Sequence, residues 1–334
     1  MEENNNIETT ENVNFESRID LKPLLDSISA IKNELGSVIV GQTKMIDQLL
    51  VAILANGHVL LEGVPGVAKT ITAKLIAKTL QIGFSRIQFT PDLMPSDILG
   101  TSVYDLKKSE FEFKKGPIFS NLILIDEINR APAKTQAALF EVMEERQITM
   151  DGTRYVLEAP FLVIATQNPI EQEGTYRLPE AQLDRFLFKI TIDYPKLDEE
   201  ITIIQREHVL QSQSKLENIK TILTGQDIQK YQLLVKQVIV EPELIEYIAK
   251  IVMTTRENAF LYLGASPRAS IAILNASKGF AALRGRDFVT PEDIKEAAIP
   301  VLQHRVIVTP EREMEGISSV EIIKQIIESV AIPR

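Results

Sequence analysis

The stretch that decides the fold is HVLLEGVPGVAKT, which runs from His58 to Thr70. Its first four residues form an apolar run typical of a buried strand, and Thr70 opens a segment with helical spacing. Between them lies the turn Gly63-Val64-Pro65-Gly66-Val67-Ala68-Lys69-Thr70. A strand, a glycine-containing turn with a terminal lysine and hydroxyl residue, and a helix form the context that a phosphate-binding loop requires.

This pattern predicts how an anion is held. The backbone N–H groups of the loop and the positive end of the helix dipole favour a phosphate. We expect Lys69 to place its charge on the β- and γ-phosphates and Thr70 to give a hydroxyl ligand to Mg²⁺. Ala68 stands where such loops usually carry a glycine before the lysine. A methyl group is tolerated there if the φ angle of Ala68 is helical.

A second stretch, Leu122-Ile123-Leu124-Ile125-Asp126-Glu127, is an apolar strand that ends in two carboxylates. Successive side chains on a strand point to opposite faces. We therefore expect Asp126 to reach the Mg²⁺ ion while Glu127 faces elsewhere, where it activates a water molecule. A hydrolase needs this division between an acid that organises the metal and one that accepts a proton.

Helices and strands alternate outward from these two stretches. Apolar spacing predicts a helix from Leu21 to about Gly36, a second helix after Gly41-Gln42 and a third over Thr135–Glu145. Further strands are predicted at Ile87–Phe89, Phe161–Ala165 and Phe186–Ile192. The alternation indicates an α/β fold with a mainly parallel sheet flanked by helices.

Two segments interrupt this alternation, and helices follow it. Ile98–Phe119 is predicted to form a loop or hairpin, and Gln147–Leu157 to form a hairpin that turns at Asp151-Gly152. After Tyr194-Pro195 the strand signal fades, so the C-terminal third is predicted to be all-α. Within it, Thr290-Pro291-Glu292-Asp293 has the pattern of an N-cap, a proline in the first turn and a capping acid.

Composition excludes several classes of protein. The 334 residues include 36 Lys and Arg, 46 Asp and Glu and no cysteine, which gives a net charge of −10 and rules out thiolate chemistry. The net negative charge argues against a protein whose main function is to bind nucleic acid. The acidic N-terminus lacks the pattern of a secretory signal, and no apolar run is long enough to span a bilayer. We therefore expect a cytoplasmic protein without a membrane partner.

The motifs together resemble those of the AAA+ ATPases, and more narrowly the MoxR family, over roughly residues 20 to 310. The phosphate-binding loop corresponds to Walker A, and Asp126-Glu127 to Walker B. Further matching stretches are Phe89 to Asp97, Leu124 to Arg146, Ala165-Thr166-Gln167-Asn168-Pro169 and Leu178 to Phe186. The resemblance implies a P-loop AAA+ core over residues 19–194 and a helical lid domain over 195–334. Residues 1–18 are rich in Asn, Glu and Thr and poor in bulky apolar residues, which predicts a flexible acidic tail.

The resemblance also implies roles for residues outside the two Walker motifs. Asn168 matches the sensor-1 position, which holds the attacking water or the γ-phosphate. Arg185 matches the arginine finger that acts on the nucleotide of the neighbouring subunit. Arg268 matches sensor 2, which reaches the γ-phosphate of its own subunit from the lid. Gly41 and Gln42 resemble the segment that lines the adenine pocket.

The implied function is an Mg-dependent ATPase that assembles as a homo-oligomeric ring, most simply a hexamer, and remodels protein clients as a chaperone. Such families are associated with maturation of enzyme complexes, including metal-cofactor insertion, and with partners that contain von Willebrand factor A domains. Two alternatives stay open at this point. One is a ring motor that remodels nucleic acid, although the net charge argues against it. The other is a nucleotide-gated binding module that hydrolyses little.

Overall fold

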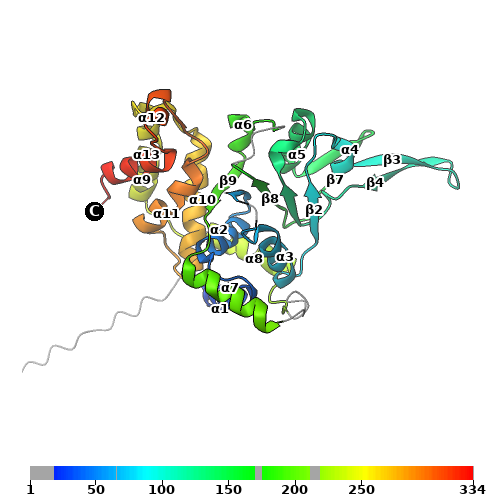
Figure 1. The fold of residues 1–334 in the computed structure, drawn as a ribbon, viewed down its shortest axis with the longest axis horizontal. Helices are drawn as coiled ribbons and strands as arrows, with labels where there is room; N and C mark the ends of the chain where they lie inside the picture. Colours follow the sequence, from blue (N-terminus) through cyan, green and yellow to red (C-terminus); the bar gives the residue numbers. More distant parts are fainter. Residues whose placement is uncertain (1–18, 65, 170–174, 211–218, 334) are drawn as a thin grey trace, which may run out of the picture.

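Among the residues that the computed structural model describes, which are 19–64, 66–169, 175–210 and 219–333, five parallel strands form the central sheet. Their order across the sheet is β2–β5–β8–β1–β9 (Figure 1). The strands are β1 (His58–Gly63), β2 (Phe84–Gln88), β5 (Leu122–Asp126), β8 (Leu162–Gln167) and β9 (Phe186–Ile192). The predicted α/β fold with a parallel sheet is confirmed.

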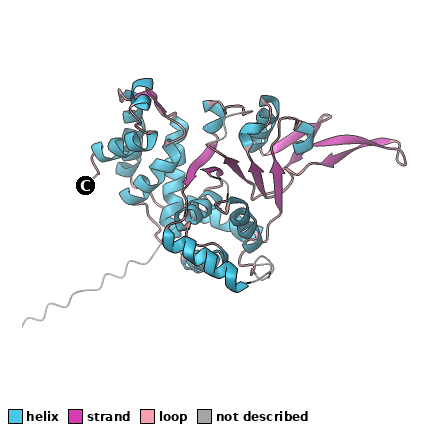
Figure 2. Ribbon diagram, in the orientation of Figure 1, coloured by secondary structure: helices cyan, strands magenta, loops and turns pink. Residues whose placement is uncertain are grey.

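Helices cover both faces of this sheet (Figure 2). One face carries α1 (Lys22–Val38), α2 (Thr43–Leu54) and α3 (Lys69–Thr79), and the other carries α4 (Pro95–Leu99) and α5 (Ala133–Glu145). The strands are apolar without alternation because both of their faces are buried. In β5, Leu124 packs into the cluster of the first face and Ile123 into the cluster of the second.

Both predicted insertions are hairpins. The first consists of β3 (Gly100–Asp105) and β4 (Glu110–Lys115), and it projects from the body of the molecule (Figure 1). The second consists of β6 (Gln147–Met150) and β7 (Thr153–Val156), which turn at Asp151-Gly152 as predicted. The two hairpins touch, because the Ser102 hydroxyl donates to the Asp151 carboxylate.

Helices dominate the C-terminal part. They are α7 (Leu197–Leu210), α8 (Gly225–Lys236), α9 (Pro242–Glu257), α10 (Pro267–Leu283), α11 (Pro291–Leu302), α12 (Pro310–Met314) and α13 (Ser319–Ser329). The capping pattern is confirmed, since the Asp293 carboxylate accepts from the Thr290 N–H at 2.9 Å. The prediction that this part is all-α is wrong in one respect: β10 (Leu261–Leu263) pairs with β11 (Ile307–Val308). These strands are too short for a period-2 pattern to show.

The lid helices pack directly on the core. Phe188 of β9 and Phe280 of α10 have ring centroids 6.2 Å apart. At Gly279 of α10, a Cβ atom would lie 2.8 Å from a methyl group of Val51 in α2, so these helices cross closely. One apolar cluster therefore continues from the sheet into the lid. No helix among the described residues is long and apolar enough to cross a membrane.

The start of α3 corrects one expectation about the loop. Ala68 has φ 61° and ψ 17°, which is left-handed and not helical. An L-residue in this region is disfavoured because its Cβ approaches the following carbonyl group. The glycine usual at this position avoids that cost, so the methyl group of Ala68 stores strain in the loop.

We predict that Ala68→Gly raises the free energy of unfolding by about 1 kcal/mol, because glycine adopts a left-handed conformation freely. The matched control is Ala137→Gly on the exposed surface of α5, where glycine should lower the free energy of unfolding by about 1 kcal/mol. Urea denaturation measures both. A stability loss in Ala68→Gly would contradict the strain.

His58 gives a second prediction. Its Nδ1 accepts from the Val163 N–H at 3.0 Å, and its Nε2 lies 3.1 Å from the Met143 carbonyl oxygen, so the ring is held neutral. Burial, with a smaller effect from Arg146, lowers the pKa of His58 from 6.5 to about 4. As the pH falls, His58 is therefore protonated in the unfolded chain before it is protonated in the folded protein. The contribution of neutral His58 to the free energy of unfolding is complete above pH 6.5 and is lost as the pH falls toward 4.

His58→Gln removes this titration while keeping a donor for Met143. We expect wild type to lose up to about 3 kcal/mol more than the variant between neutral pH and pH 4. The pKa of His304 is also lowered by burial, so a smaller pH dependence remains in the variant. Urea denaturation across this pH range is the measurement. Equal pH dependence in the two proteins would show that His58 does not titrate in this way.

Candidate functional site

A cavity of about 430 Å³, here called the lysine cavity, opens where β1, β5 and β8 end and α3 begins. Its described lining residues are Gly66, Ala68, Lys69, Thr70, Ile71, Arg86, Gln88, Asp126, Glu127, Thr166 and Asn168. The carboxyl ends of parallel strands share one edge of the sheet, which is why residues far apart in the sequence meet here.

The loop between β1 and α3 forms one wall of the lysine cavity. The Lys69 ammonium donates to the carbonyl oxygen of Gly63 at 2.7 Å, which holds the side chain over the loop. Gly63 lies close to β9, since a Cβ atom would come within 2.8 Å of the Ile192 carbonyl oxygen. Val64 and Val67 do not line the lysine cavity, and Pro65 is not among the residues that the structure describes.

Both predicted acids face the lysine cavity. Asp126 is the last residue of β5 and is 8% exposed. Glu127 does not continue the strand, because its φ of 58° and ψ of 53° are left-handed. The alternation of a strand therefore stops at Asp126, so the separation of Glu127 from the metal acid does not come from opposite faces of a strand as predicted. Its role beside the attacking water stays a prediction. The Glu127 N–H donates to the Thr166 hydroxyl at 3.1 Å, which fixes this turn against β8.

Polar neighbours that the sequence did not reveal hold these acids. The Arg86 guanidinium donates to the Asp126 carboxylate at 2.6 Å, and the Thr166 hydroxyl donates to its other oxygen at 3.3 Å. Gln88 donates to the Glu127 carboxylate at 3.0 Å, and Arg130 lies 2.9 Å from the same oxygen. Each acid thus has a cationic or amide partner inside the lysine cavity.

Arg86 and Gln88 lie on β2, whose register places Gln88 opposite Asp126 on β5. The apolar spacing predicts a strand in this region, but nothing in it indicates that this strand pairs with β5. The alternation of polar residues at 86 and 88 indicates one polar face of the strand and does not name its partners. Asn168 directly follows β8 and lines the lysine cavity, so the structure brings it together with Lys69 and both acids, as expected.

The charge balance of the lysine cavity suits an anion with a divalent cation. Burial lowers the pKa of Lys69, and the carboxylates of Asp126, Glu127 and Glu62 oppose part of this shift. The Thr70 hydroxyl and the Asp126 carboxylate supply oxygen atoms, which are the ligands that Mg²⁺ takes. Each carboxylate oxygen of Asp126 has a second lone pair beyond its present hydrogen bond. The residues therefore fit a nucleotide with Mg²⁺.

Gly41 and Gln42 lie beside the linker to α7 and not in the lining of the lysine cavity. The Gln42 side-chain amide donates to the Asp193 carbonyl oxygen at 3.3 Å. Gly41 has φ 67°, and a Cβ atom there would collide with the Glu199 carboxylate. Their predicted role at the adenine base stays a prediction.

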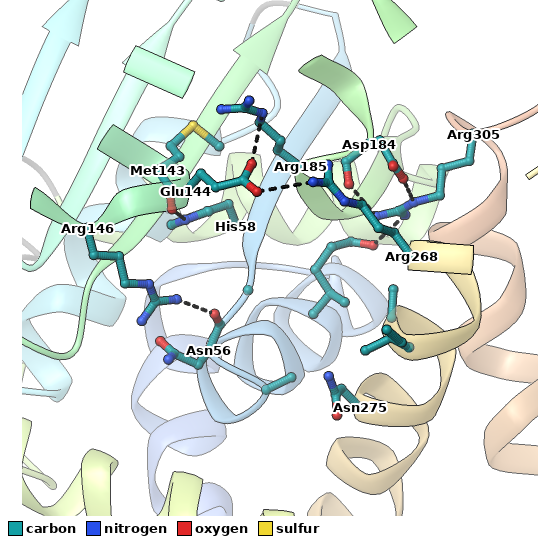
Figure 3. Close-up of a pocket in the computed structure, with 15 residues that line it drawn as sticks. Asn56, His58, Met143, Glu144, Arg146, Asp184, Arg185, Arg268, Asn275 and Arg305 are labelled. Carbon is teal, nitrogen blue, oxygen red and sulfur yellow. Dashed lines mark hydrogen bonds and ion pairs between the residues drawn. The ribbon is translucent and has the colours of Figure 1, made fainter. Parts of the chain in front are cut away.

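A second cavity of about 300 Å³, here called the arginine cavity, lies at the opposite edge of the sheet (Figure 3). It opens at His58, the first residue of β1, whereas the lysine cavity opens beyond Gly63, the last. At about 3.3 Å per residue, the length of β1 separates these edges by about 17 Å. The charged residues that line the arginine cavity are Glu144, Arg146, Asp184, Arg185, Arg268 and Arg305.

Glu144 joins two of the predicted functional arginines (Figure 3). Its carboxylate lies 3.2 Å from Arg185 Nε and 3.1 Å from Arg268 Nη2. Arg185 also donates to the carbonyl oxygen of Phe140. The expectation that Arg268 reaches the phosphate of its own subunit is wrong for this arrangement, because α10 starts at the edge remote from Lys69. The structure groups Arg268 with Arg185 instead.

Comparisons with known proteins agree with this architecture. A family model described as "ATPase family associated with various cellular activities (AAA)" matches residues 58–188, and one described as "AAA lid domain" matches residues 253–326. The chain is similar to a crystal structure of a candidate ATPase from Cytophaga hutchinsonii. That likeness has a TM-score of 0.87 and 45% identity, and covers 94% of this chain and 97% of that one.

Two curated relatives extend along nearly the whole chain. Protein YeaC of Bacillus subtilis is 45% identical over 94% of this chain and 96% of its own length. Chaperone MoxR1 of Mycobacterium tuberculosis is 44% identical over 90% of this chain and 81% of its own length. With the Walker motifs in one cavity and a helical lid beside it, this likeness shows that the chain belongs to the MoxR family of AAA+ ATPases.

Proposed function

We propose that this ATPase hydrolyses ATP to ADP and phosphate in the lysine cavity. The observation that supports this most is the meeting of Lys69, both acids and Asn168 in one cavity at the start of α3. Lys69 would bind the β- and γ-phosphates, where the N–H groups at the start of the helix also point. Gly41 and Gln42 would contact the adenine.

Thr70 and Asp126 would hold the Mg²⁺ ion. When bound, Mg²⁺ neutralises charge that develops on the phosphate oxygens. Arg86 balances the Asp126 carboxylate at 2.6 Å in this structure, and its side chain is 53% exposed. It therefore has room to move aside toward solvent when the carboxylate takes a new partner.

Glu127 would act as the general base that takes a proton from the attacking water, and Asn168 would orient that water. Glu127 is held by Gln88 at 3.0 Å and by Arg130 at 2.9 Å in this structure. Both contacts are to the same carboxylate oxygen, Oε2, so the attacking water would donate its proton to Oε1.

Arg185 and Arg268 would act on the nucleotide of a neighbouring subunit. Both lie in the arginine cavity, at the edge of the sheet opposite Lys69, so neither serves the lysine cavity of its own chain. A contact that joins one edge of a subunit to the other edge of the next is head-to-tail, and its repetition by rotation closes a ring. We propose a homohexamer.

The cycle would remodel protein clients in the cytoplasm, with residues 19–194 as the nucleotide-binding core and 195–334 as the lid. A relative that is 44% identical is named a chaperone, which supports a protein client. Maturation of enzyme complexes, metal-cofactor insertion and partners with von Willebrand factor A domains are the specific forms that we propose for this task.

Glu127→Gln tests the hydrolytic role. We expect kcat for ATP hydrolysis to fall at least about a hundredfold, because a general base contributes about 10²–10⁴-fold. The affinity for ATP should change little, since Lys69 and the loop are untouched. The matched control is Glu110→Gln on the exposed hairpin, which should leave kcat unchanged. Unchanged turnover in Glu127→Gln would remove Glu127 from the base role.

Mixing two inactive variants tests action between subunits. Arg185→Ala should bind ATP normally and lose roughly 10³-fold or more in hydrolysis. Lys69→Ala should lose ATP binding but retain Arg185 for the neighbouring site. An equal mixture should recover about a quarter of wild-type activity, because half the subunits have an intact lysine cavity and half of their neighbours an intact finger.

A double variant with both substitutions, mixed with Lys69→Ala, is the control and should stay inactive. Full activity of Arg185→Ala alone would exclude the finger role. No recovery from the mixture, despite rings of normal mass, would contradict action across the interface.

A further inference from the structure

Arg305, just after α11 in the lid, is a buried cation bound to the segment that carries Arg185. Its side chain is 3% exposed. Its Nε donates to the Asp184 carboxylate at 2.7 Å, and its Nη2 donates to the carbonyl oxygens of Asp184 at 2.9 Å and Phe186 at 2.6 Å. Arg305 therefore binds the residues on both sides of Arg185 in the sequence.

The remaining nitrogen of Arg305 is also engaged. Nη1 donates to the carbonyl oxygens of Val301 at 2.5 Å and Leu187 at 3.2 Å. Burial of a guanidinium is costly unless its donors are satisfied and its charge is paired, and here both conditions are met. The planar fork of Arg305 thus fixes the backbone from Asp184 to Leu187 relative to the end of α11 (Figure 3).

Ser266 makes a second bond from the lid to the same carboxylate. It occupies the N-cap of α10, where a serine hydroxyl usually accepts from the first-turn N–H groups. Here the side chain makes no capping bond and its hydroxyl donates to Asp184 at 3.1 Å. Ser266 therefore bonds to the segment that carries Arg185 instead of capping its own helix.

We propose that Arg305 and Ser266 are positioning residues that tie the placement of Arg185 to the orientation of the lid. The proposal rests on the proposed function of Arg185 in the neighbouring site. Both residues would act through Asp184, to which each donates a hydrogen bond. Because Arg185 is bracketed by residues that the lid holds, a rotation of the lid moves the finger as well. The lid of one subunit thereby controls hydrolysis in the next.

Arg305→Lys and Ser266→Ala test this positioning role. Lysine keeps the charge beside Asp184 but cannot bind the two flanking carbonyl groups in one plane. Because small misplacements of catalytic groups cost up to about 10²-fold, we expect kcat to fall about tenfold or more in Arg305→Lys and about threefold to tenfold in Ser266→Ala. KM should stay within about twofold of wild type, since the lysine cavity is remote.

The controls remove comparable groups elsewhere in the lid. Arg286→Lys weakens another arginine that binds a buried carboxylate, Asp293. Ser318→Ala removes the N-cap hydroxyl of α13, which accepts from the Glu321 N–H. Both controls lower the stability of the lid without touching the Arg185 segment. We expect their kcat to stay within about twofold of wild type.

Mixed rings separate a positioning role from simple damage to the lid. Arg305→Lys mixed with Lys69→Ala should recover activity toward about a quarter of wild type, because an intact finger then faces an intact lysine cavity. Arg305→Lys mixed with Arg185→Ala should recover none. Ser266→Ala, with its single lost hydrogen bond, keeps the test valid should Arg305→Lys fold poorly. Its equal mixture with Lys69→Ala should show about twice or more of the activity that dilution of Ser266→Ala to half would leave, because intact fingers then face half of its lysine cavities.

The outcomes distinguish this inference from the function on which it rests. Absence of ATP hydrolysis in wild type, or normal hydrolysis in Arg185→Ala, would overturn the proposed function and the inference together. Normal kcat in Arg305→Lys and Ser266→Ala, while Arg185→Ala is inactive, would overturn the inference alone. Failure of Lys69→Ala to rescue either variant would also overturn it, because the defect would then lie in the variant's own lysine cavity.

Discussion

Parallel pairing of β1 with β8 and β9 places the two ends of one six-residue strand in two different cavities. Beyond its carboxyl end lies Lys69, and beside its amino end lies Arg185. A parallel sheet cannot bring these ends together, because all its carboxyl ends share one edge. We therefore propose that the phosphate-binding lysine and the finger arginine of one chain serve different nucleotides, and that a second copy of the chain completes each site.

Charged groups in both cavities are paired with other groups of the same chain. Asp126 is bound by Arg86, Glu127 by Gln88, and Arg185 shares Glu144 with Arg268. An exposed ion pair such as that between Arg268 and Glu144 contributes only about 0–1 kcal/mol, so it separates readily when a better partner arrives. In the proposed cycle, nucleotide in the lysine cavity and a neighbouring subunit at the arginine cavity would be such partners. Arg305 is different, because its buried bonds to Asp184 and Phe186 hold it to one segment.

The sequence predicted the elements well because each has a local signature. The apolar run at β5, the turn at Asp151-Gly152 and the loop before α3 depend on residues close in the chain. Arg86 was missed because its partner Asp126 lies 40 positions away, and only the strand order of the sheet joins them. Arg268 was predicted to lie near Lys69 but lies at the opposite edge of the sheet. The residues around it predict the start of a helix, but they do not predict where that helix packs on the core. The strain at Ala68 was not predicted because the residue type alone does not determine the φ angle that the loop imposes on it.

The proposed ring requires that each active site receives groups from two subunits. Specific ATPase activity should be measured against protein concentration with Mg²⁺, with light scattering for mass. We expect activity per subunit to rise as a ring-sized species appears. Constant activity per subunit from a monomer would contradict it, because a single chain would then supply every catalytic group that hydrolysis needs.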